Sequence, residues 1–477
     1  MQIAVFWVFT VLKQILKFSP IRSRPRAREK SANRLIVCWL ISTILVLKRV
    51  ARILIEKMTR LFVFCSSLLL LCASCKESLP PFPEVGEPYA ITRGPEDHLL
   101  ANYFGINAWS PDGRYVCVLG TTINGRLPEQ EDTATVALVD LADNFRYIPI
   151  SRTTCWNFQE AAMFHWLPWE DGLCAFNDCR DGKFVTVLLN WKTGEERIVQ
   201  RPVSAVDPTG EWAVSINYAR LRLCRPDYGY AGQGQDPLAG EMWPEQDGLW
   251  LVNLKTGEER LILSVAEARE KMTKITSDDG LAYFCHTIIS PDASKVFFLA
   301  RTVQDFQAQL ASRGHVYKWD TVSLTVRTDG TDLRRCFPDG WQGSHFNWKD
   351  SETLLVTARW NAGALWSHVL FTVGKEEERK HLAPGIMDWD GHCVFSPDGE
   401  FVSSEGYWNK DGYRSWALLR VKDEAVRSLG QFQVPEKYRE TYSRCDLHAR
   451  WRPDGKQLGF NSVHEGSRQV YLRDVKY

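Results

Sequence analysis

A short turn sequence that recurs along the chain constrains its fold more than any other feature. Four copies follow an aromatic or aliphatic residue and read Ser-Pro-Asp-Gly or nearly so, at 110–113, 290–293, 396–399 and 452–455. Three weaker copies lie at 166–172, 206–210 and 348–350. Proline presets φ at the second turn position and Asp-Gly accepts left-handed backbone, so each copy predicts a tight hairpin between two strands. Seven copies indicate a repeat architecture, although their spacing is uneven and the widest gap lies between Pro208 and Pro291.

A second hairpin follows most copies of the turn, as in the near-twin segments 188–197 and 251–260. Two hairpins make a four-stranded antiparallel sheet, which cannot bury both of its faces alone. Neighbouring sheets must therefore stack, and radial closure protects their edges. The sequence predicts an all-β, seven-bladed β-propeller that resembles the TolB and WD40-like propellers. Its 12% aromatic content, including 19 Trp, suits such packed sheets.

The first 85 residues differ from the rest, because apolar runs at 3–16 and 35–47 flank a basic stretch at 22–34. Met58-Thr59-Arg60, an apolar run at 61–71 and small residues that end at Cys75 are typical of a secretory signal. This end resembles the lipobox of bacterial lipoproteins, in which the cysteine is diacylated, although Cys72 stands where an aliphatic residue is usual. A plain cleaved signal or a retained anchor are the alternatives.

The resulting division is an upstream extension at 1–57, a lipoprotein signal peptide at 58–75, a tether at 76–90 and the propeller at 91–477. We expect a periplasmic or outer-membrane lipoprotein of a bacterial cell envelope, held to the membrane by a lipid on Cys75. Lys+Arg and Asp+Glu both number 58, so no global charge favours a nucleic-acid partner. Nine of the 13 cysteines lie after the signal at irregular spacing, which predicts at most a few disulfides.

Aligning the blades on the turn exposes a second pattern, at the position three residues before the aromatic or aliphatic residue. This channel position is Ile106, Met163 and Val203 in the first three blades, and histidine in the last four: His286, His345, His392 and His448. Equivalent positions on the innermost strands line the central channel, so four imidazoles should converge there. Imidazole binds Mn, Fe, Zn, Ni or Cu, and three or four such ligands with an open position favour catalysis.

The alternative is structural, because WD40 proteins use a repeated histidine for hydrogen bonds within each blade. Such a histidine should then appear in most blades, whereas these four occupy one contiguous arc. The pattern therefore favours a metal or anion site in the channel.

Seven TolB-like blades with channel-facing histidines resemble the oligogalacturonate lyase family over most of the body. That family binds a divalent ion, typically manganese, through histidines and a glutamine on neighbouring blades, and its Gln-x-x-His pair is similar to Gln342-Gly343-Ser344-His345. The resemblance implies the metal ligands His286, Gln342, His345 and His392. It leaves His448 as a further ligand or a supporting group.

Lyase chemistry on a uronide removes the weakly acidic C5 proton, so the site must neutralise the adjacent carboxylate and supply a base. A long insertion at 217–246 is rich in Arg and Tyr. Arg220 and Arg225 are the candidates for a bidentate carboxylate clamp, and Tyr228 and Tyr230 for base or acid. Each arginine could instead form an ordinary ion pair, and each tyrosine could pack between blades.

These features predict an exported propeller with a His-lined divalent-metal site, acting as a polysaccharide or oligouronide lyase on an acidic glycan. The alternative is a non-catalytic TolB-like propeller that binds a protein or glycan partner. Propellers host many unrelated functions, so the fold does not decide between the two.

Overall fold

The computed structural model describes residues 79–232, 236–272, 280–304, 319–439 and 442–477, together with nine separate positions between 39 and 59. The chain divides into a unit at Met1–Leu79 and a compact unit at Pro80–Tyr477. Cys75 and most of the predicted signal peptide lie outside the described residues, so lipid anchoring stays a prediction. Among the helices that are described, none has the length and apolar character needed to cross a membrane.

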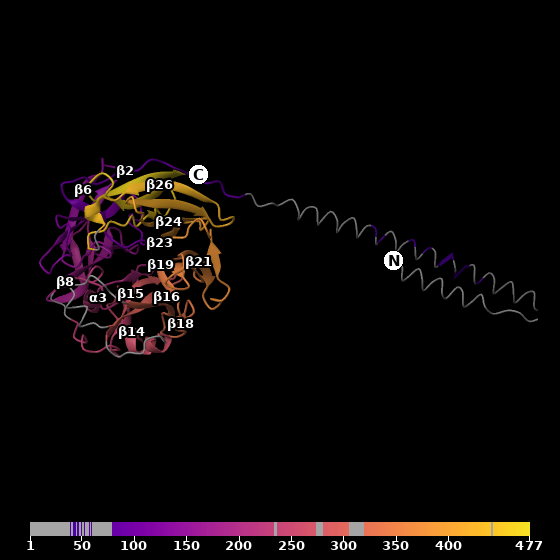
Figure 1. Ribbon diagram of the computed structural model, residues 1–477, viewed down its shortest axis with the longest axis horizontal. Helices are drawn as coiled ribbons and strands as arrows, with labels where there is room; N and C mark the ends of the chain where they lie inside the picture. The colour runs from indigo at the N-terminus through magenta and orange to yellow at the C-terminus, as the bar shows by residue number, and fades with distance from the viewer. Residues whose placement is uncertain are drawn as a thin grey trace, which may run out of the picture. The chain divides into compact units, whose positions relative to one another are not determined.

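The second unit is the seven-bladed propeller that the turns predicted, with one antiparallel sheet for each copy of the turn (Figure 1). Blade one comprises β3 (Asp97–Leu100), β4 (Tyr115–Thr121), β5 (Ala134–Asp140) and β6 (Arg146–Thr153). Blade two comprises β7 (His165–Trp166), β8 (Leu173–Arg180), β9 (Lys183–Asn190) and β10 (Glu195–Val199). Blade three comprises β11 (Ala205–Val206), β12 (Trp212–Ser215), β13 (Gly248–Asn253) and β14 (Glu259–Ser264).

Blades four to six follow the same order of strands. Blade four comprises β15 (Gly280–Ile289), β16 (Lys295–Gln304), β17 (Trp319–Arg327) and β18 (Arg334–Arg335). Blade five comprises β19 (Gln342–Trp348), β20 (Thr353–Arg359), β21 (Ser367–Thr372) and β22 (Lys380–Leu382). Blade six comprises β23 (Gly391–Phe395), β24 (Phe401–Trp408), β25 (Tyr413–Arg420) and β26 (Val426–Gln433). The first strands β15, β19 and β23 lie toward the middle of the ring (Figure 1).

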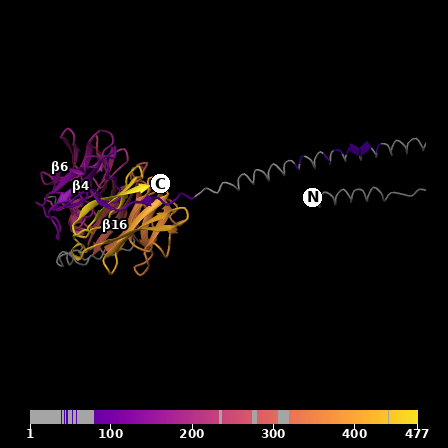
Figure 2. The same cartoon turned by 90° about the horizontal axis from the view of Figure 1, so that it is seen from above.

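Blade seven closes the ring by joining the two ends of the unit. It contains β27 (Arg450–Trp451), β28 (Gln457–Ser462) and β29 (Gln469–Lys476) from the C-terminal end. The N-terminal strands β1 (Glu84–Val85) and β2 (Tyr89–Ala90) both pair with β29, so early residues complete the last blade. Seen after a 90° turn, β4 and β6 lie on one side of the ring and β16 on the other (Figure 2). This closure pairs an edge that would otherwise be exposed.

The recurring turn joins the first and second strands of each blade. In blade four the Ser290 hydroxyl donates to Asp292 Oδ1 at 2.6 Å and accepts the Lys295 backbone N–H at 3.0 Å. Gly399 occupies the left-handed region in blade six, with φ of 71°. Ala293 holds the same place in blade four at φ of 59°, so an L-residue there adopts a conformation that favours glycine.

Helices occur in the connections. In the insertion of blade three, α3 (Tyr218–Cys224) is capped by the Asn217 side chain, which accepts the Arg220 backbone N–H. After β14 come α4 (Val265–Ala268) and the 3₁₀ turn η1 (Arg269–Lys271), and η2 (Glu436–Tyr438) follows β26. Eight buried thiols in the described residues form no disulfide: Cys117, Cys155, Cys174, Cys224, Cys285, Cys336, Cys393 and Cys445.

Candidate metal centre

The four channel-position histidines converge, although they lie on four different blades. His286 is in β15, His345 in β19 and His392 in β23, and His448 lies two residues before β27. The ring centres of His345 and His392 are 4.0 Å apart, and those of His392 and His448 are 4.3 Å apart. All four side chains are buried. The predicted convergence of imidazoles is therefore present in the structure.

Two aromatic residues from blade one lie against the histidines. The loop after β3 places Tyr103 with its ring centre 5.5 Å from that of His286 and 5.2 Å from that of His448. The adjacent Phe104 lies 5.8 Å from His345 and 4.7 Å from His392 by the same measure. The Tyr103–Phe104 pair therefore packs against the histidine cluster, and the sequence analysis did not predict this contact.

Local backbone irregularities aim two of these rings. The β15–β16 register shifts between Cys285 and Ile288, and the β19–β20 register shifts between Gly343 and Phe346, so His286 and His345 both lie on bulged segments. His286 also has φ of 57°, an uncommon value for a residue with a side chain. Bulges of this kind re-aim side chains and are common beside functional sites.

Acidic side chains lie within hydrogen-bond distance of two of the four imidazoles. His345 Nδ1 lies 2.8 Å from Asp390 Oδ1, and His392 Nδ1 lies 2.6 Å from Glu405 Oε1 on the facing strand. Glu405 Oε1 also accepts the backbone N–H of His448 at 3.0 Å. Metal-binding histidines commonly have their second ring nitrogen paired in this way, which fixes the ring orientation.

Three ring nitrogens of the cluster have no hydrogen-bond partner among the described residues: His286 Nδ1, His392 Nε2 and His448 Nε2. Burial lowers the pKa of all three histidines well below the usual value. They are therefore neutral near pH 7, with a lone pair available for a cation.

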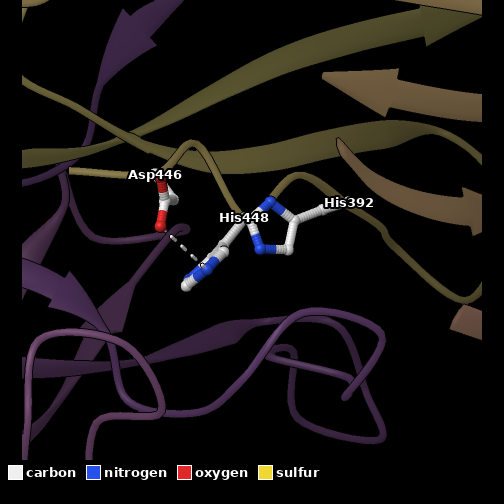
Figure 3. A group of neighbouring side chains, drawn as sticks. All are labelled: His392, Asp446 and His448. Atoms are coloured by element: carbon white, nitrogen blue, oxygen red, sulfur yellow. Dashed lines mark ion pairs between the residues drawn. The ribbon is translucent and has the colours of Figure 1, made fainter. Parts of the chain in front are cut away.

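Asp446 adds a carboxylate that the sequence analysis missed. Donor atoms of His392, Asp446 and His448 all lie within 4.8 Å of one another, and Figure 3 shows the three side chains together. Burial alone would raise the pKa of Asp446, but Arg414 and Arg444 hold it well below its usual value. The only sequence signal for this residue was its place two positions before His448 in blade seven.

A cavity of about 600 Å³ opens beside the cluster. His286 and His345 line it, so two of the four imidazoles face its interior. Four guanidinium groups and two carboxylates also line it, those of Arg225, Arg301, Arg359, Arg444, Asp320 and Asp390. An excess of cationic side chains in a partly enclosed site suits an anionic ligand.

The structure brings Arg225 and Tyr228 to this cavity from the blade-three insertion. Arg225 makes a two-pronged ion pair with Asp227, with both N–O distances 3.1 Å. The Tyr228 hydroxyl accepts a hydrogen bond from Arg444 at 3.0 Å, and its ring centre lies 4.8 Å from that of His286. Burial raises the pKa of Tyr228, although Arg444 and Arg225 act in the opposite direction.

Arg220 and Tyr230, the other two candidates from the insertion, do not line the cavity. Arg220 is fully buried, paired with Asp236 at 2.8 Å, and donates to the backbone carbonyl of Ala282 at 2.6 Å. Tyr230 stacks on Tyr218 with ring centres 4.3 Å apart. The structure therefore places both in the packing of blades two to four, because a partner for each lies inside the insertion or the adjacent blade.

Gln342 lines the cavity three residues before His345, as the Gln-x-x-His pattern requires, and its Oε1 accepts a hydrogen bond from Arg359 Nε at 2.8 Å. Tyr407, Arg301, Arg359 and Arg444 are cavity residues that the sequence analysis did not single out. Each comes from a strand or loop that carries no repeated motif, so only the folded ring brings them together.

No family model and no curated protein matches the chain. Solved structures do match its fold. An oligogalacturonate lyase from Vibrio parahaemolyticus is matched at 13% identity over 83% of this chain and 97% of that chain, with a TM-score of 0.55. An oligogalacturonate lyase in complex with manganese is matched at 17% identity with the same coverages and TM-score. TolB from Acinetobacter baumannii is matched at 11% identity over 68% of this chain and 66% of that chain, with a TM-score of 0.36.

Proposed function

We propose that this chain is a metal-dependent lyase that cleaves uronic-acid-containing saccharides by β-elimination in the cavity beside the histidine cluster. One observation carries the proposal: buried imidazoles, with ring nitrogens that have no hydrogen-bond partner in the described part of the chain, converge from neighbouring blades next to a cavity lined by four arginines. The fold likeness to two oligogalacturonate lyases, one of them in complex with manganese, supports this choice of reaction.

The donor set fits a divalent cation such as Mn²⁺, because imidazole nitrogens and a carboxylate are ordinary ligands of first-row metals. His392, Asp446 and His448 would hold it, with His286 and His345 on the cavity side of the cluster. Glu405 would fix the orientation of the His392 ring, and Asp390 that of the His345 ring. A bound divalent ion would supply charge stabilisation for a substrate carboxylate.

The cavity arginines would bind and orient that carboxylate. Arg225 is held by Asp227 and Arg444 by Asp446, so both guanidinium groups are fixed before a ligand arrives. Fixed cationic donors stabilise the negative charge that develops on the carboxylate when the C5 proton leaves. Arg225 therefore remains the clamp residue proposed from the sequence, with Arg444 in the place expected for Arg220.

Tyr228 is the residue of this chain that we assign to proton transfer. Its hydroxyl is fixed by Arg444 and its ring lies against His286, beside the proposed carboxylate site. Burial raises the pKa of Tyr228, so its hydroxyl is protonated near pH 7 and could donate its proton to the leaving O4. The phenolate that this leaves, which Arg444 and Arg225 stabilise, could then accept the C5 proton.

The direct test is an activity assay with galacturonate oligomers and Mn²⁺, following the ultraviolet absorbance of the unsaturated product. We expect product formation that a chelator stops. Tyr228→Phe keeps the ring packing and removes the hydroxyl, so it should lower kcat by about a hundredfold or more. Tyr477→Phe, at the exposed C-terminal residue, is the matched control.

A flat trace on galacturonate, glucuronate and mannuronate oligomers would contradict the lyase proposal. Saccharide binding without product would instead support the alternative, a non-catalytic propeller that binds a glycan partner.

A further inference from the structure

A cluster of indole rings stands on blade five at the rim of the cavity. The hairpin between β20 and β21 carries Trp360, Leu365 and Trp366 within seven residues, 360–366. Trp366 lines the cavity, whereas Trp360 is 49% exposed and Leu365 is 65% exposed. Large apolar side chains that gather on one exposed hairpin are a candidate binding surface.

Trp341 extends this rim at the start of blade five. Its ring is parallel to that of Phe337, with centres 5.2 Å apart, and its centre lies 6.5 Å from that of Trp360. Trp341 also lines a small hollow of about 80 Å³ that shares Asp320, Thr321 and Gln342 with the main cavity. The indoles are therefore continuous with the proposed site and not an isolated patch.

Arginines stand beside two of these rings. The Arg359 guanidinium carbon lies 4.8 Å from the centre of the Trp366 ring, and that of Arg379 lies 5.0 Å from the centre of the Trp341 ring. Such cation–π contacts hold the indoles in place and keep positive charge next to them. A ligand for this rim should therefore offer both apolar faces and negative charge.

We propose that the cluster formed by Trp341, Trp360 and Trp366, here called the indole rim, binds the sugar units that neighbour the unit held in the cavity. This inference rests on the proposed function, and it names the substrate as an oligosaccharide longer than two units. A pyranose ring presents a face of C–H groups that packs on an indole, while the carboxylates of a uronide chain would meet Arg359 and Arg379.

Continuity with the cavity favours the saccharide over a protein partner or a membrane surface. A docking protein would need a larger apolar area than one hairpin provides. A saccharide chain that leaves the cavity, in contrast, must cross this rim if it exits over blade five.

The test is binding of galacturonate disaccharide and hexasaccharide to Mn²⁺-loaded protein, measured by calorimetry with all chains carrying Tyr228→Phe so that the saccharide is not cleaved. We expect the chain with an intact indole rim to bind the hexasaccharide about tenfold more tightly than the disaccharide, the effect of one or two aromatic contacts. Trp360→Ala should remove most of that advantage and leave disaccharide affinity unchanged. Tyr477→Ala, which removes another exposed aromatic ring, should keep it.

Equal affinity for both lengths when the indole rim is intact, or a full length advantage in Trp360→Ala, would contradict the proposed role of the indole rim. Binding with the expected length dependence but no product in the activity assay would support the rim and contradict the lyase. Failure of every saccharide to bind would contradict both.

Discussion

Blades one to three and blades four to seven share one turn and one sheet order, but they differ at the channel position. In the first three blades it is Ile106, Met163 and Val203, and the latter two are buried in the same core cluster as Tyr103 and Phe104. In the last four it is histidine, and these imidazoles lie against the rings of Tyr103 and Phe104. The difference teaches that the repeat builds the ring, whereas one arc of it carries the candidate metal ligands.

The supporting groups behind the channel position differ in the same way. Val203 is bracketed by Asn177, whose side chain donates to its carbonyl at 2.8 Å and accepts its N–H at 2.7 Å. His392 is bracketed by Glu405, which in turn pairs with Arg414 at 3.2 Å. An amide side chain thus fixes the backbone in one half, and an acidic side chain orients a ring in the other.

The largest expected effect is on metal affinity, which should depend on the channel position in blades four to seven and not in blades one to three. His392→Ala removes a ring nitrogen of the proposed site, so it should lower the affinity for Mn²⁺ by more than about a hundredfold, because loss of supporting groups alone commonly lowers it ten- to a hundredfold. Val203→Ala changes the same position in the apolar half. It should lower the free energy of unfolding by about 1–3 kcal/mol and leave Mn²⁺ affinity unchanged.

Calorimetric Mn²⁺ titration and urea unfolding of both variants would measure this contrast. If His392→Ala binds Mn²⁺ as tightly as the wild-type chain does, His392 is not a metal ligand. The proposed difference in metal binding between the two halves is then contradicted.

The next effect concerns one buried arginine in each half. Arg414→Met leaves Glu405 and Asp446 without their shared cation, and Arg220→Met leaves Asp236 without its own. Breaking a buried ion pair in this way should lower the free energy of unfolding by about 3–5 kcal/mol in either variant. Only Arg414→Met should also weaken Mn²⁺ binding, since Glu405 orients His392 and Asp446 is a proposed metal ligand.

The double variant Arg220→Met/Asp236→Leu is the control, because removing both charges should recover much of the lost stability. A folded Arg220→Met protein with an altered KM for saccharide would mean that Arg220 contributes to substrate binding, as the sequence analysis first proposed.

The repeat explains why so much of the fold could be predicted from the sequence. The turn specifies a hairpin locally, and seven hairpins leave few arrangements other than a closed ring. The aligned histidines were predictable for the same reason, because a residue at a fixed distance from the turn lies at an equivalent place in every blade. His286, His345, His392 and His448 therefore converge as their register required.

The site residues that could not be predicted from the sequence lie in segments outside the repeated strands and turns, so the repeat does not fix their positions. Tyr103 and Phe104 lie in an irregular loop, and Asp446 and Arg444 lie in the connection before β27. In the sequence of the insertion, nothing distinguished Arg220 from Arg225 as a candidate for the carboxylate clamp. Helix α3 separates them, because it aims Arg220 at the carbonyl of Ala282 and ends before Arg225 reaches the cavity.

A smaller effect concerns pH and a histidine in the apolar half. His165 in β7 has no partner for Nε2 within the described part of the chain, and burial lowers its pKa to about 3. The unfolded chain takes up a proton below about pH 6.5 while the folded one does not, so stability falls as pH falls from 6.5 toward 3. At pH 5 this loss is about 2 kcal/mol.

His165→Gln should therefore reduce the stability difference between pH 7 and pH 5 by about 2 kcal/mol in urea unfolding. His381→Gln in the half-exposed strand β22 serves as the background variant. An unchanged difference in His165→Gln would mean that His165 is protonated in the folded chain or that water satisfies it.

The smallest effect tests the part that both halves share. A Cβ added at Gly399 would meet only Lys349 Cε, at 3.7 Å, so Gly399→Ala has room and is opposed by its φ of 71° alone. That conformation disfavours an L-residue by about 1 kcal/mol, which urea unfolding can resolve. Ala293→Gly in blade four is the reverse change, and its gain should be smaller because glycine also increases the entropy of the unfolded chain. Both variants should keep wild-type Mn²⁺ affinity, since the turn lies beyond the end of the strand that carries the histidine. A change in Mn²⁺ affinity in either one would mean that the turn helps to aim the imidazoles, and the separation between a repeated scaffold and a chemical arc would no longer hold.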